Sequence, residues 1–471
     1  MSFLTKSSLS LLLLTSAVTS VVEARDYAWI IGGGYDLQSS QAQIEKNVSW
    51  AADVIRSRSP ATQLKIYFDD GNDPLKDVLE WHPVNDSDDR MLPLARIYDT
   101  YIASGEQYRN HTINNVAGST DTESMLPQLV KDFAELQQGD QALLIYNGHG
   151  GQQTPDPLTN VMWLWNDSSL DVRGMDKLLS NIDPAVPLRF VFTQCYSGGF
   201  AYLTHKQTNR CGFMAVPPDR QAEGCSAAVD IGDYRDYSTY FFAALSGRSR
   251  TGKPLQRDPD LDHDGQVSLY EAHLYALRTA VSSDLPRSTS ETFLLDWRPW
   301  YQRLFATDSP DNQYARISKT LKQRYAIHNR TDIAKRRRAL QQRLDEYRNA
   351  RAHLVRLIKQ RSRKLRAELE RRWPEVSYAY TRNFVHFLQH DLDAAVAYLL
   401  ANSDYTDLVS KQKEYQLLKK QRLAVERELM QLQKIDFLDT LASTYDYFQQ
   451  HANEADRQQY QRLFACENSN L

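Results

Sequence analysis

Four short apolar runs, separated by segments with helical spacing, most constrain the fold of this chain. Each run ends at glycine or polar residues, and together they cover residues 27–32, 64–68, 141–146 and 188–193. Between them, apolar residues recur every three or four positions over residues 39–55, 125–136 and 175–179. Strands that alternate with helices form a parallel sheet with helices on both faces. The sequence therefore predicts an α/β domain whose functional loops follow the carboxyl ends of the strands.

The composition of the chain changes near residue 312. Glycine is absent beyond this point, and apolar residues recur at a three-four spacing. The first series is Leu340, Leu344, Tyr347, Leu354, Ile358 and Leu365, and the second is Leu418, Val425, Leu429 and Leu432. This spacing predicts a helical hairpin or small bundle, with Pro374 at the start or at a kink of one helix. We therefore expect an all-α helical domain over residues 312–471.

Charge also divides the chain at this boundary. The net charge of the 471 residues is −3, but residues 313–372 carry 20 Lys and Arg against 5 Asp and Glu. Residues 373–471 carry 10 against 14, so the first 312 residues have a net charge of −14. We expect the basic helices to dock on this acidic front part. Binding to a membrane or a nucleic acid is an alternative, but charged helix faces are usually only solvated, so no nucleic-acid partner is expected.

The first residues have the pattern of an export signal. Lys6 precedes an apolar run over residues 9–14, and Val22 and Ala24 have the spacing that a signal peptidase reads. The sequence therefore predicts a signal peptide over residues 1–24 and a secreted or periplasmic protein. The apolar run is too short to span a bilayer, which needs about 20 residues. No later stretch is long enough either, so no transmembrane segment is expected.

The four cysteines are informative in an exported chain. Cys211 and Cys225 are close in sequence, and a disulfide between them would close a small loop and stabilise the fold by about 3 kcal/mol. Cys195 and Cys466 then have no obvious partner. A thiol that stays free in an oxidising compartment is a candidate reactive group.

A histidine and a cysteine follow the third and fourth apolar runs, each flanked by glycine. His149 lies in Tyr146-Asn-Gly-His-Gly-Gly151, and Cys195 lies in Thr193-Gln-Cys-Tyr-Ser-Gly-Gly199. A thiol peptidase needs a cysteine nucleophile, an imidazole that takes its proton, and N–H groups that hold the oxyanion. Flanking glycines leave such N–H groups unobstructed. The two loops therefore indicate a catalytic dyad.

These motifs resemble those of the caspase-fold (clan CD) cysteine peptidases, and in particular the legumain-like family. That family includes the legumains and the catalytic subunit of the glycosyl-phosphatidylinositol transamidase, which Gly148-His-Gly-Gly151 resembles. The resemblance implies a caspase-like catalytic domain over residues 25–255. It also implies that His149 is the general base, that Cys195 is the nucleophile, and that the N–H groups of Gly150 and Cys195 form the oxyanion hole. The expected activity is that of a cysteine endopeptidase acting through a thioester on a peptide or protein.

The sequence departs from the family at two positions that bear on specificity. Thr193 stands where relatives usually have Glu, Asp or Gln, and residues 38–40 lack the arginine by which legumains recognise asparagine. Neither asparagine nor aspartate specificity is therefore carried over. A transpeptidase or transamidase would use the same dyad, and an inactive binding protein of the same fold is a further alternative.

A twelve-residue segment matches the EF-hand calcium loop at every ligand position. The ligands expected from the pattern are Asp260, Asp262, Asp264, the Gln266 carbonyl, Ser268 and Glu271, with Gly265 at the turn. A helix is expected to follow the loop from Leu269, but glycines and a proline interrupt the stretch before it. We therefore expect a single, structural Ca²⁺ site within a connecting segment, residues 256–311.

The role of the helical domain stays open at this point. Legumains have a helical C-terminal prodomain, so the resemblance implies that these helices cover the active site. Recruitment of a partner is the alternative. Cleavage of the chain near residue 310 on activation would favour the prodomain.

Overall fold

The computed structural model describes residues 24–74, 76–82, 90–98, 105–205, 207–227, 229–301, 310–378 and 381–471. The predicted signal peptide, apart from Ala24, lies outside the described residues, and so do residues 302–309 beside the expected domain boundary.

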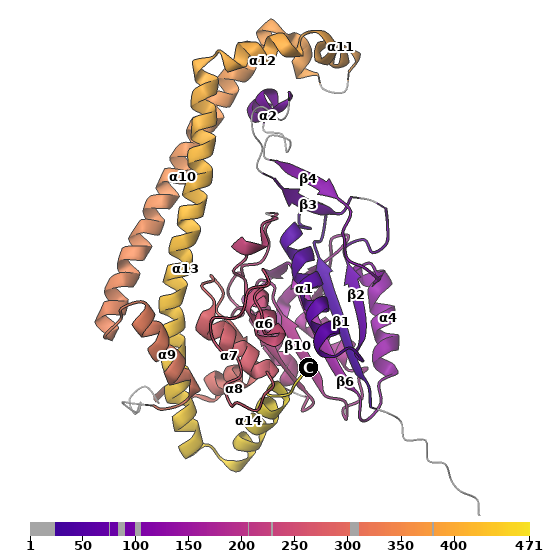
Figure 1. Cartoon of the computed structure of the whole chain (residues 1–471), viewed down its shortest axis with the longest axis vertical. Helices are drawn as coiled ribbons and strands as arrows, with labels where there is room; N and C mark the ends of the chain where they lie inside the picture. Colours follow the sequence, from indigo (N-terminus) through magenta and orange to yellow (C-terminus); the bar gives the residue numbers. More distant parts are fainter. Residues whose placement is uncertain are drawn as a thin grey trace, which may run out of the picture.

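A seven-stranded sheet forms the centre of the front part of the molecule (Figure 1). Its strands, in order across the sheet, are β12 (Arg287–Ser288), β11 (Arg210–Met214), β10 (Leu188–Phe192), β6 (Gln141–Gly148), β1 (Asp26–Gly33), β2 (Gln63–Phe68) and β5 (Val116–Gly118). Neighbouring strands are parallel except for the antiparallel pair β11–β12. The predicted class, a mostly parallel sheet flanked by helices and followed by a helical region, is confirmed.

Helices cover both faces of the sheet because successive strand residues point to opposite sides. Ile30 of β1 joins the core under α1 (Ala42–Arg58), α6 (Tyr237–Ser246) and α7 (Leu269–Thr279). Its neighbours Trp29 and Ile31 join the opposite core, under α4 (Thr122–Ala134) and α5 (Val172–Leu179). The strands are therefore apolar on both faces, which explains why they appear in the sequence as continuous apolar runs.

Smaller elements surround the sheet. An antiparallel pair, β3 (Val78–Trp81) and β4 (Glu106–Arg109), projects from it towards α2 (Leu92–Tyr98) (Figure 1). A three-stranded antiparallel sheet follows His149 and consists of β7 (Gly150–Gln152), β8 (Asn160–Leu164) and β9 (Ser168–Asp171). Helix α8 (Thr289–Trp297) follows β12.

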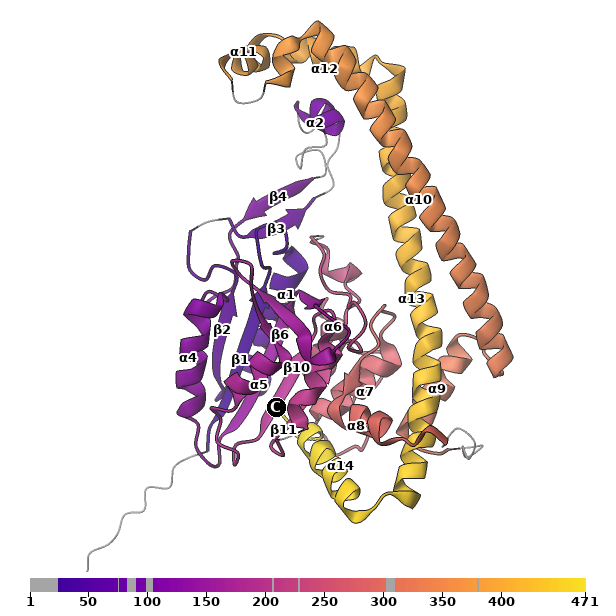
Figure 2. The same cartoon turned by 180° about the vertical axis from the view of Figure 1, so that it is seen from behind.

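A long helical hairpin dominates the C-terminal region (Figures 1 and 2). Its two arms are α10 (Arg330–Arg372) and α13 (Ser403–His451), and the shorter helices are α9 (Gln313–Arg324), α11 (Arg382–His390), α12 (Leu392–Leu400) and α14 (Glu454–Glu467). Leu340, Leu354 and Leu365 of α10 are buried, as the spacing predicts. Pro374 begins a short 3-10 turn, Pro374–Ser377, after α10 has ended. Among the described residues, no helix has both the length and the hydropathy that crossing a bilayer requires.

The hairpin contacts the front part at two places. Near its base, Leu432, Leu438 and Leu441 of α13 join the same buried cluster as α1, α6 and α7. At its tip, Leu365 and Leu369 of α10 pack with residues of α2. The helical region therefore docks on the front part mainly through apolar contacts. Some of the basic residues of α10 instead pair with acidic residues of α13, as in the ion pairs Arg336–Glu428 and Arg361–Asp407.

Candidate active site and calcium loop

The two glycine-flanked loops lie at the carboxyl ends of adjacent strands. In the register of β6 and β10, Tyr146 is paired with Phe192. His149 and Cys195 each follow one of these paired residues by three positions, so the two loops leave the sheet at the same level. This is the geometry that the parallel order of the strands predicts.

The imidazole of His149 is held through one of its nitrogens. Nε2 lies 2.8 Å from the carbonyl oxygen of Ser39 and 2.9 Å from Oε1 of Gln41. Both partners are acceptors, so Nε2 carries the hydrogen and Nδ1 keeps its lone pair. Burial lowers the pKa of His149 and so favours the neutral ring. The ring therefore has the tautomer and charge state of a base.

Cys195 is half-buried in a tight turn. The next residue, Tyr196, has φ +61°, a left-handed conformation that bends the chain sharply after the cysteine. The Cys195 sulfur accepts a hydrogen bond from the amide of Ala222 at 3.3 Å. Burial raises the pKa of the Cys195 thiol, so the thiol form is favoured at neutral pH. Within the described part of the chain, its sulfur has no hydrogen bond to His149.

The backbone of Gly150 lies directly against Cys195. A Cβ atom at Gly150 would lie 2.2 Å from the carbonyl oxygen of Cys195 and 2.6 Å from Cγ of Gln194. Any other residue would push the two loops apart. The amide groups expected to form the oxyanion hole therefore belong to residues in direct contact.

A small cavity of about 10 Å³ lies beside the Cys195 thiol, enough space for about one water molecule. Its walls come from α1, from the ends of β6 and β10, and from the segment 222–225. Asn147 and Thr193 contribute neutral polar groups, with the Thr193 hydroxyl 2.7 Å from Oδ1 of Asn147. Thr193 thus holds the Asn147 side chain at the wall of the cavity.

The stretch 38–40, in which no arginine is present, contacts His149 and the end of β2. The Ser39 carbonyl accepts from His149, and the Ser40 hydroxyl donates to Asp69. Sequence reasoning missed Ser39 and Gln41 as partners of His149, because more than 100 residues separate them along the chain.

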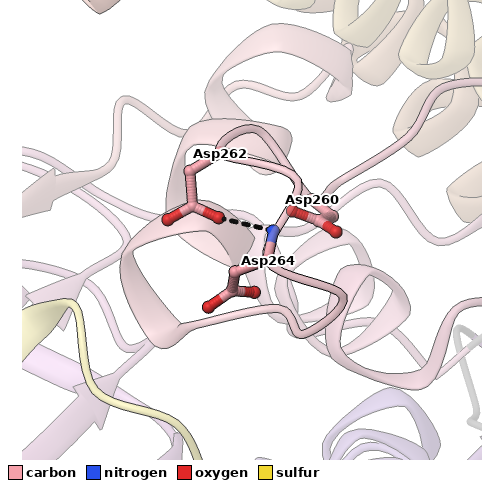
Figure 3. Close-up of side chains that lie close together, drawn as sticks. All are labelled: Asp260, Asp262 and Asp264. Carbon is pink, nitrogen blue, oxygen red and sulfur yellow. Dashed lines mark hydrogen bonds between the residues drawn. The ribbon is translucent and has the colours of Figure 1, made fainter.

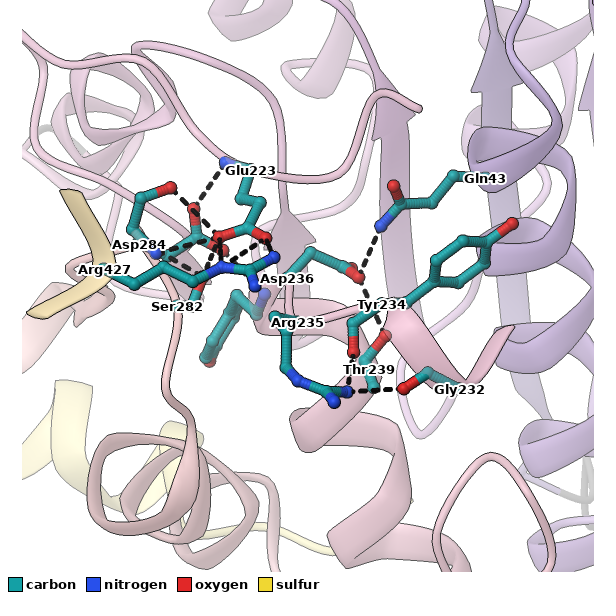
Figure 4. Close-up of polar contacts among 12 residues, drawn as sticks. Gln43, Glu223, Gly232, Tyr234, Arg235, Asp236, Thr239, Ser282, Asp284 and Arg427 are labelled. Atoms are coloured by element: carbon teal, nitrogen blue, oxygen red, sulfur yellow. Dashed lines mark hydrogen bonds and ion pairs between the residues drawn. The ribbon is translucent and has the colours of Figure 1, made fainter. Parts of the chain in front are cut away.

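A network of polar contacts holds Glu223, which follows the residue that contacts the Cys195 sulfur, Ala222 (Figure 4). Glu223 accepts hydrogen bonds from Ser282 and Ser283 and forms an ion pair with Arg427 of α13. The amide of Glu223 in turn donates to Asp284 at 2.6 Å. Arg427 and Glu223 are both largely shielded from solvent. The helical hairpin therefore fastens the segment that lies against the candidate nucleophile.

Three of the expected calcium ligands lie together. Carboxylate oxygens of Asp260, Asp262 and Asp264 lie within 4.8 Å of one another (Figure 3). Asp260 accepts from the amide of Gly265 at 3.0 Å, and Asp262 accepts from that of Asp264 at 3.1 Å. Gly265 has φ +86°, which fits the turn expected there.

The remaining expected ligands serve the helix that follows the loop. Ser268 caps α7, and Glu271 closes the capping box by accepting from the amide of Ser268 at 2.9 Å. Glu271 also accepts from the amide of Leu261 at 2.6 Å and is not part of the aspartate cluster. The side chain of Gln266 accepts from Asn470, which leaves its carbonyl as the expected ligand. No helix precedes the loop over residues 248–268, as the sequence indicates.

The predicted disulfide between Cys211 and Cys225 is wrong. Cys211 lies in β11 and is bonded to Cys466 of α14, while Cys195 and Cys225 are not disulfide-bonded. Cys211 lies near the start of its strand, but Cys225 lies beyond the opposite end of the sheet, near Gly148. The prediction relied on closeness in sequence. It failed because β11 carries the chain from the amino ends of the strands to their carboxyl ends.

No protein-family model matches the chain, and no curated protein matches it in sequence. A crystal structure of a protein from Geobacter sulfurreducens, a structural genomics target, is similar over 56% of this chain and 92% of that chain. The sequence identity is 10% and the TM-score is 0.33. A similarity at this level carries no argument about function.

Proposed function

We propose that the chain is a cysteine endopeptidase of the caspase fold, resembling the legumain-like family, with Cys195 as nucleophile and His149 as general base. The observation that carries the proposal is the meeting of two glycine-flanked loops at adjacent strand ends, where the backbone of Gly150 lies against Cys195. The orientation of His149 supports it, because both partners of Nε2 are acceptors and leave Nδ1 able to take a proton.

In this mechanism, His149 takes the thiol proton while the Cys195 sulfur attacks the carbonyl carbon of the scissile peptide bond. The amides of Gly150 and Cys195 stabilise the negative charge that develops on the carbonyl oxygen. The imidazolium then gives the proton to the leaving amine, and a thioester remains on Cys195. A water molecule activated by His149 hydrolyses the thioester and restores the free thiol.

Covalent labelling of the full chain tests these roles. A peptidyl acyloxymethyl ketone is expected to attach to Cys195, and mass spectrometry distinguishes this site from the other free thiol, Cys225. The Cys195→Ala variant is expected to lose peptide hydrolysis while its circular dichroism spectrum stays unchanged. Unchanged turnover in this variant would contradict the proposal, and absence of labelling together with absence of hydrolysis would favour a non-catalytic binding protein.

Transfer of the acyl group to an amine instead of water is the second candidate function. The likeness of Gly148-His-Gly-Gly151 to the transamidase subunit favours it. Adding hydroxylamine or a glycyl peptide to the reaction separates the two, because a transpeptidase yields the amine adduct in place of the hydrolysed acid.

Calcium binding at the aspartate loop is part of the proposal. Three carboxylates held this close repel one another unless a cation neutralises them, and oxygen ligands suit Ca²⁺. The loop is joined to the C-terminal tail, since the Leu269 amide donates to the Ser469 carbonyl and Ser268 donates to Asn468. A structural Ca²⁺ would therefore stabilise the docked tail as well as the loop.

Chelation tests this role. Removal of Ca²⁺ with EGTA is expected to lower the melting temperature, and Asp264→Asn is expected to reduce the response to added Ca²⁺. Asp258→Asn is a matched control, because Asp258 lies just outside the twelve-residue pattern. An equal response to Ca²⁺ in all three proteins would contradict a site at this loop.

Export to an oxidising compartment, either secretory or periplasmic, fits the proposed enzyme. The Cys211–Cys466 disulfide supports it, because such bonds are rare in proteins of reducing compartments. The docked helices suit a prodomain, since Arg427 fastens the segment that lies over Cys195. Detection of a cut near residue 310 in the active form would support that role.

A further inference from the structure

Two free thiols line the cavity beside the candidate nucleophile. Cys195 and Cys225 lie on the walls of the same space of about 10 Å³, which is about the size of one water molecule. The Cys225 sulfur lies 4.0 Å from the carbonyl oxygen of Gly148, beside the loop of His149. The Cys195 sulfur contacts the amide of Ala222, only three residues before Cys225.

The segment that carries Cys225 is held against Cys195 from both ends. On one side, Glu223 is fastened to Arg427 of α13. On the other side, the carbonyl oxygen of Ala227 accepts a hydrogen bond from the amide of Trp81 at 2.6 Å. Because both anchors lie within a few residues of Cys225, the two thiols stay close to each other.

Cys225 is also within reach of a small reagent. The residue is exposed at the surface, and Cys195, which lines the same cavity, is half-buried. Burial around the Cys225 sulfur raises the pKa of its thiol, so alkaline pH favours the thiolate that attacks the reagent. The Cys211–Cys466 disulfide indicates that this chain meets oxidising conditions. Under such conditions, two neighbouring thiols can be oxidised to a disulfide with each other.

We propose that Cys225 is a second reactive thiol of this site, which forms a reversible disulfide with Cys195 and so blocks the nucleophile. The oxidant is a low-molecular-weight disulfide such as glutathione disulfide. The effect on activity rests on the proposed peptidase function, but formation of the bond does not.

The exchange proceeds in two balanced steps. The Cys225 thiolate attacks glutathione disulfide, forms a mixed disulfide and releases one glutathione thiolate. The Cys195 thiolate then attacks the Cys225 sulfur, forms the intramolecular bond and releases the second glutathione. The two protein thiols are oxidised by two electrons, and glutathione disulfide is reduced to two glutathione molecules. A thiol reductant such as dithiothreitol reverses both steps.

Disulfide mapping of the full chain tests the proposal. The chain is incubated with glutathione disulfide at mildly alkaline pH, its remaining thiols are alkylated, and an unreduced digest is analysed by mass spectrometry. The expected result is a peptide pair that joins Cys195 to Cys225, in addition to the pair that joins Cys211 to Cys466. Treatment with dithiothreitol at low concentration is expected to remove the first pair and to restore alkylation of Cys195.

The Cys225→Ser variant is the control. It retains the Cys211–Cys466 pair but is expected to carry glutathione on Cys195 or leave that thiol free. Two separate glutathione adducts in the parent chain, or no oxidation of either thiol, would overturn the proposal. Because mapping needs no turnover, a chain that forms the cross-link but stays inactive after reduction with dithiothreitol would contradict only the peptidase. An active chain that forms no cross-link would contradict only the thiol pair.

Discussion

Gly150 shows how a single missing side chain sets the geometry of the candidate site. Its backbone occupies the space beside the carbonyl of Cys195, where a Cβ atom would lie at 2.2 Å. We expect Gly150→Ala to lower kcat/KM at least about 100-fold, the cost of losing one oxyanion donor. Gly118→Ala is the matched control, since a Cβ there would meet only the Tyr67 ring at 3.7 Å. Similar losses in both variants would contradict this role of Gly150.

The charge state of His149 leads to a prediction about pH. Burial lowers its pKa from the ordinary value of about 6.5, so the ring remains neutral and able to accept a proton at a lower pH. We expect kcat/KM for an uncharged peptide to fall only below about pH 6.5 as the solution is acidified. Titration of kcat/KM against pH checks this, and a midpoint above 6.5 would contradict it.

At this scale, the loops of the candidate site were easier to predict from the sequence than the residues that position its side chains. Cys195, His149 and Gly150 lie in loops whose glycines are visible in the sequence. Ser39 and Gln41 lie in a different loop, and no local pattern indicates that they face the imidazole. Contacts between loops depend on tertiary packing, which residue spacing does not encode.

Helix α13 contacts the segment beside Cys195 through the ion pair of Arg427 with Glu223. We expect Arg427→Ala to loosen the segment around Glu223 and to raise the rate at which iodoacetamide alkylates Cys195. An ion pair of about 1 kcal/mol corresponds to about a fivefold change in that rate. Arg422→Ala is the matched control, because Arg422 lies on the same helix and pairs with Glu426. Equal rates in both variants would show that the pair does not restrain the segment.

Lys434, also on α13, is fully buried and donates to the carbonyl of Ala280 at 3.0 Å. Burial lowers its pKa to about 7, whereas the unfolded chain binds this proton up to about pH 10.4. The lowered pKa means that stability is lost as pH falls from about 10 towards 7. We expect Lys434→Met to remove this part of the pH dependence and to stabilise the fold near neutral pH. Urea unfolding at several pH values measures it, and an unchanged slope would contradict the prediction.

The strands were predictable where consecutive residues along them are buried. The runs over β1, β2, β6 and β10 are apolar because both faces of the sheet are covered, so their positions were predicted within one or two residues. Strand β11 was missed, although it is buried, because Arg210-Cys-Gly-Phe-Met is too mixed in polarity to form an apolar run. The two-residue strand β12 is too short to leave any periodicity.

A disulfide bond joins two parts of the molecule that are far apart in the sequence. Cys211 and Cys466 are 255 residues apart in sequence. In the chain-entropy description, a loop of this size stabilises the fold by about 5 kcal/mol. We expect Cys466→Ser to lower the free energy of unfolding by that order, as measured with urea. The double variant with Cys211→Ser should lose no more, and a much larger loss would indicate a role for the second cysteine beyond the bond.

At the scale of the molecule, composition predicted that a helical region follows the front part of the chain. It did not predict how the two regions pack together. The absence of glycine and the excess of basic residues after residue 312 indicated a separate helical region. The shared buried cluster, which includes residues of α1, α7 and α13, joins the two regions. Apolar residues that meet across such a contact look the same in sequence as those inside one domain.

The attachment of the hairpin at both ends has a mechanical consequence. Helix α13 has 49 residues and is about 70 Å long, and two antiparallel arms make such a hairpin stiff. It is fixed to Glu223 through Arg427 at the middle of α13 and to α2 at its tip, while Trp81 of the β3–β4 pair holds Ala227. We expect a force applied at the distant tip to reach the segment beside Cys195 through α13 and the Arg427–Glu223 pair.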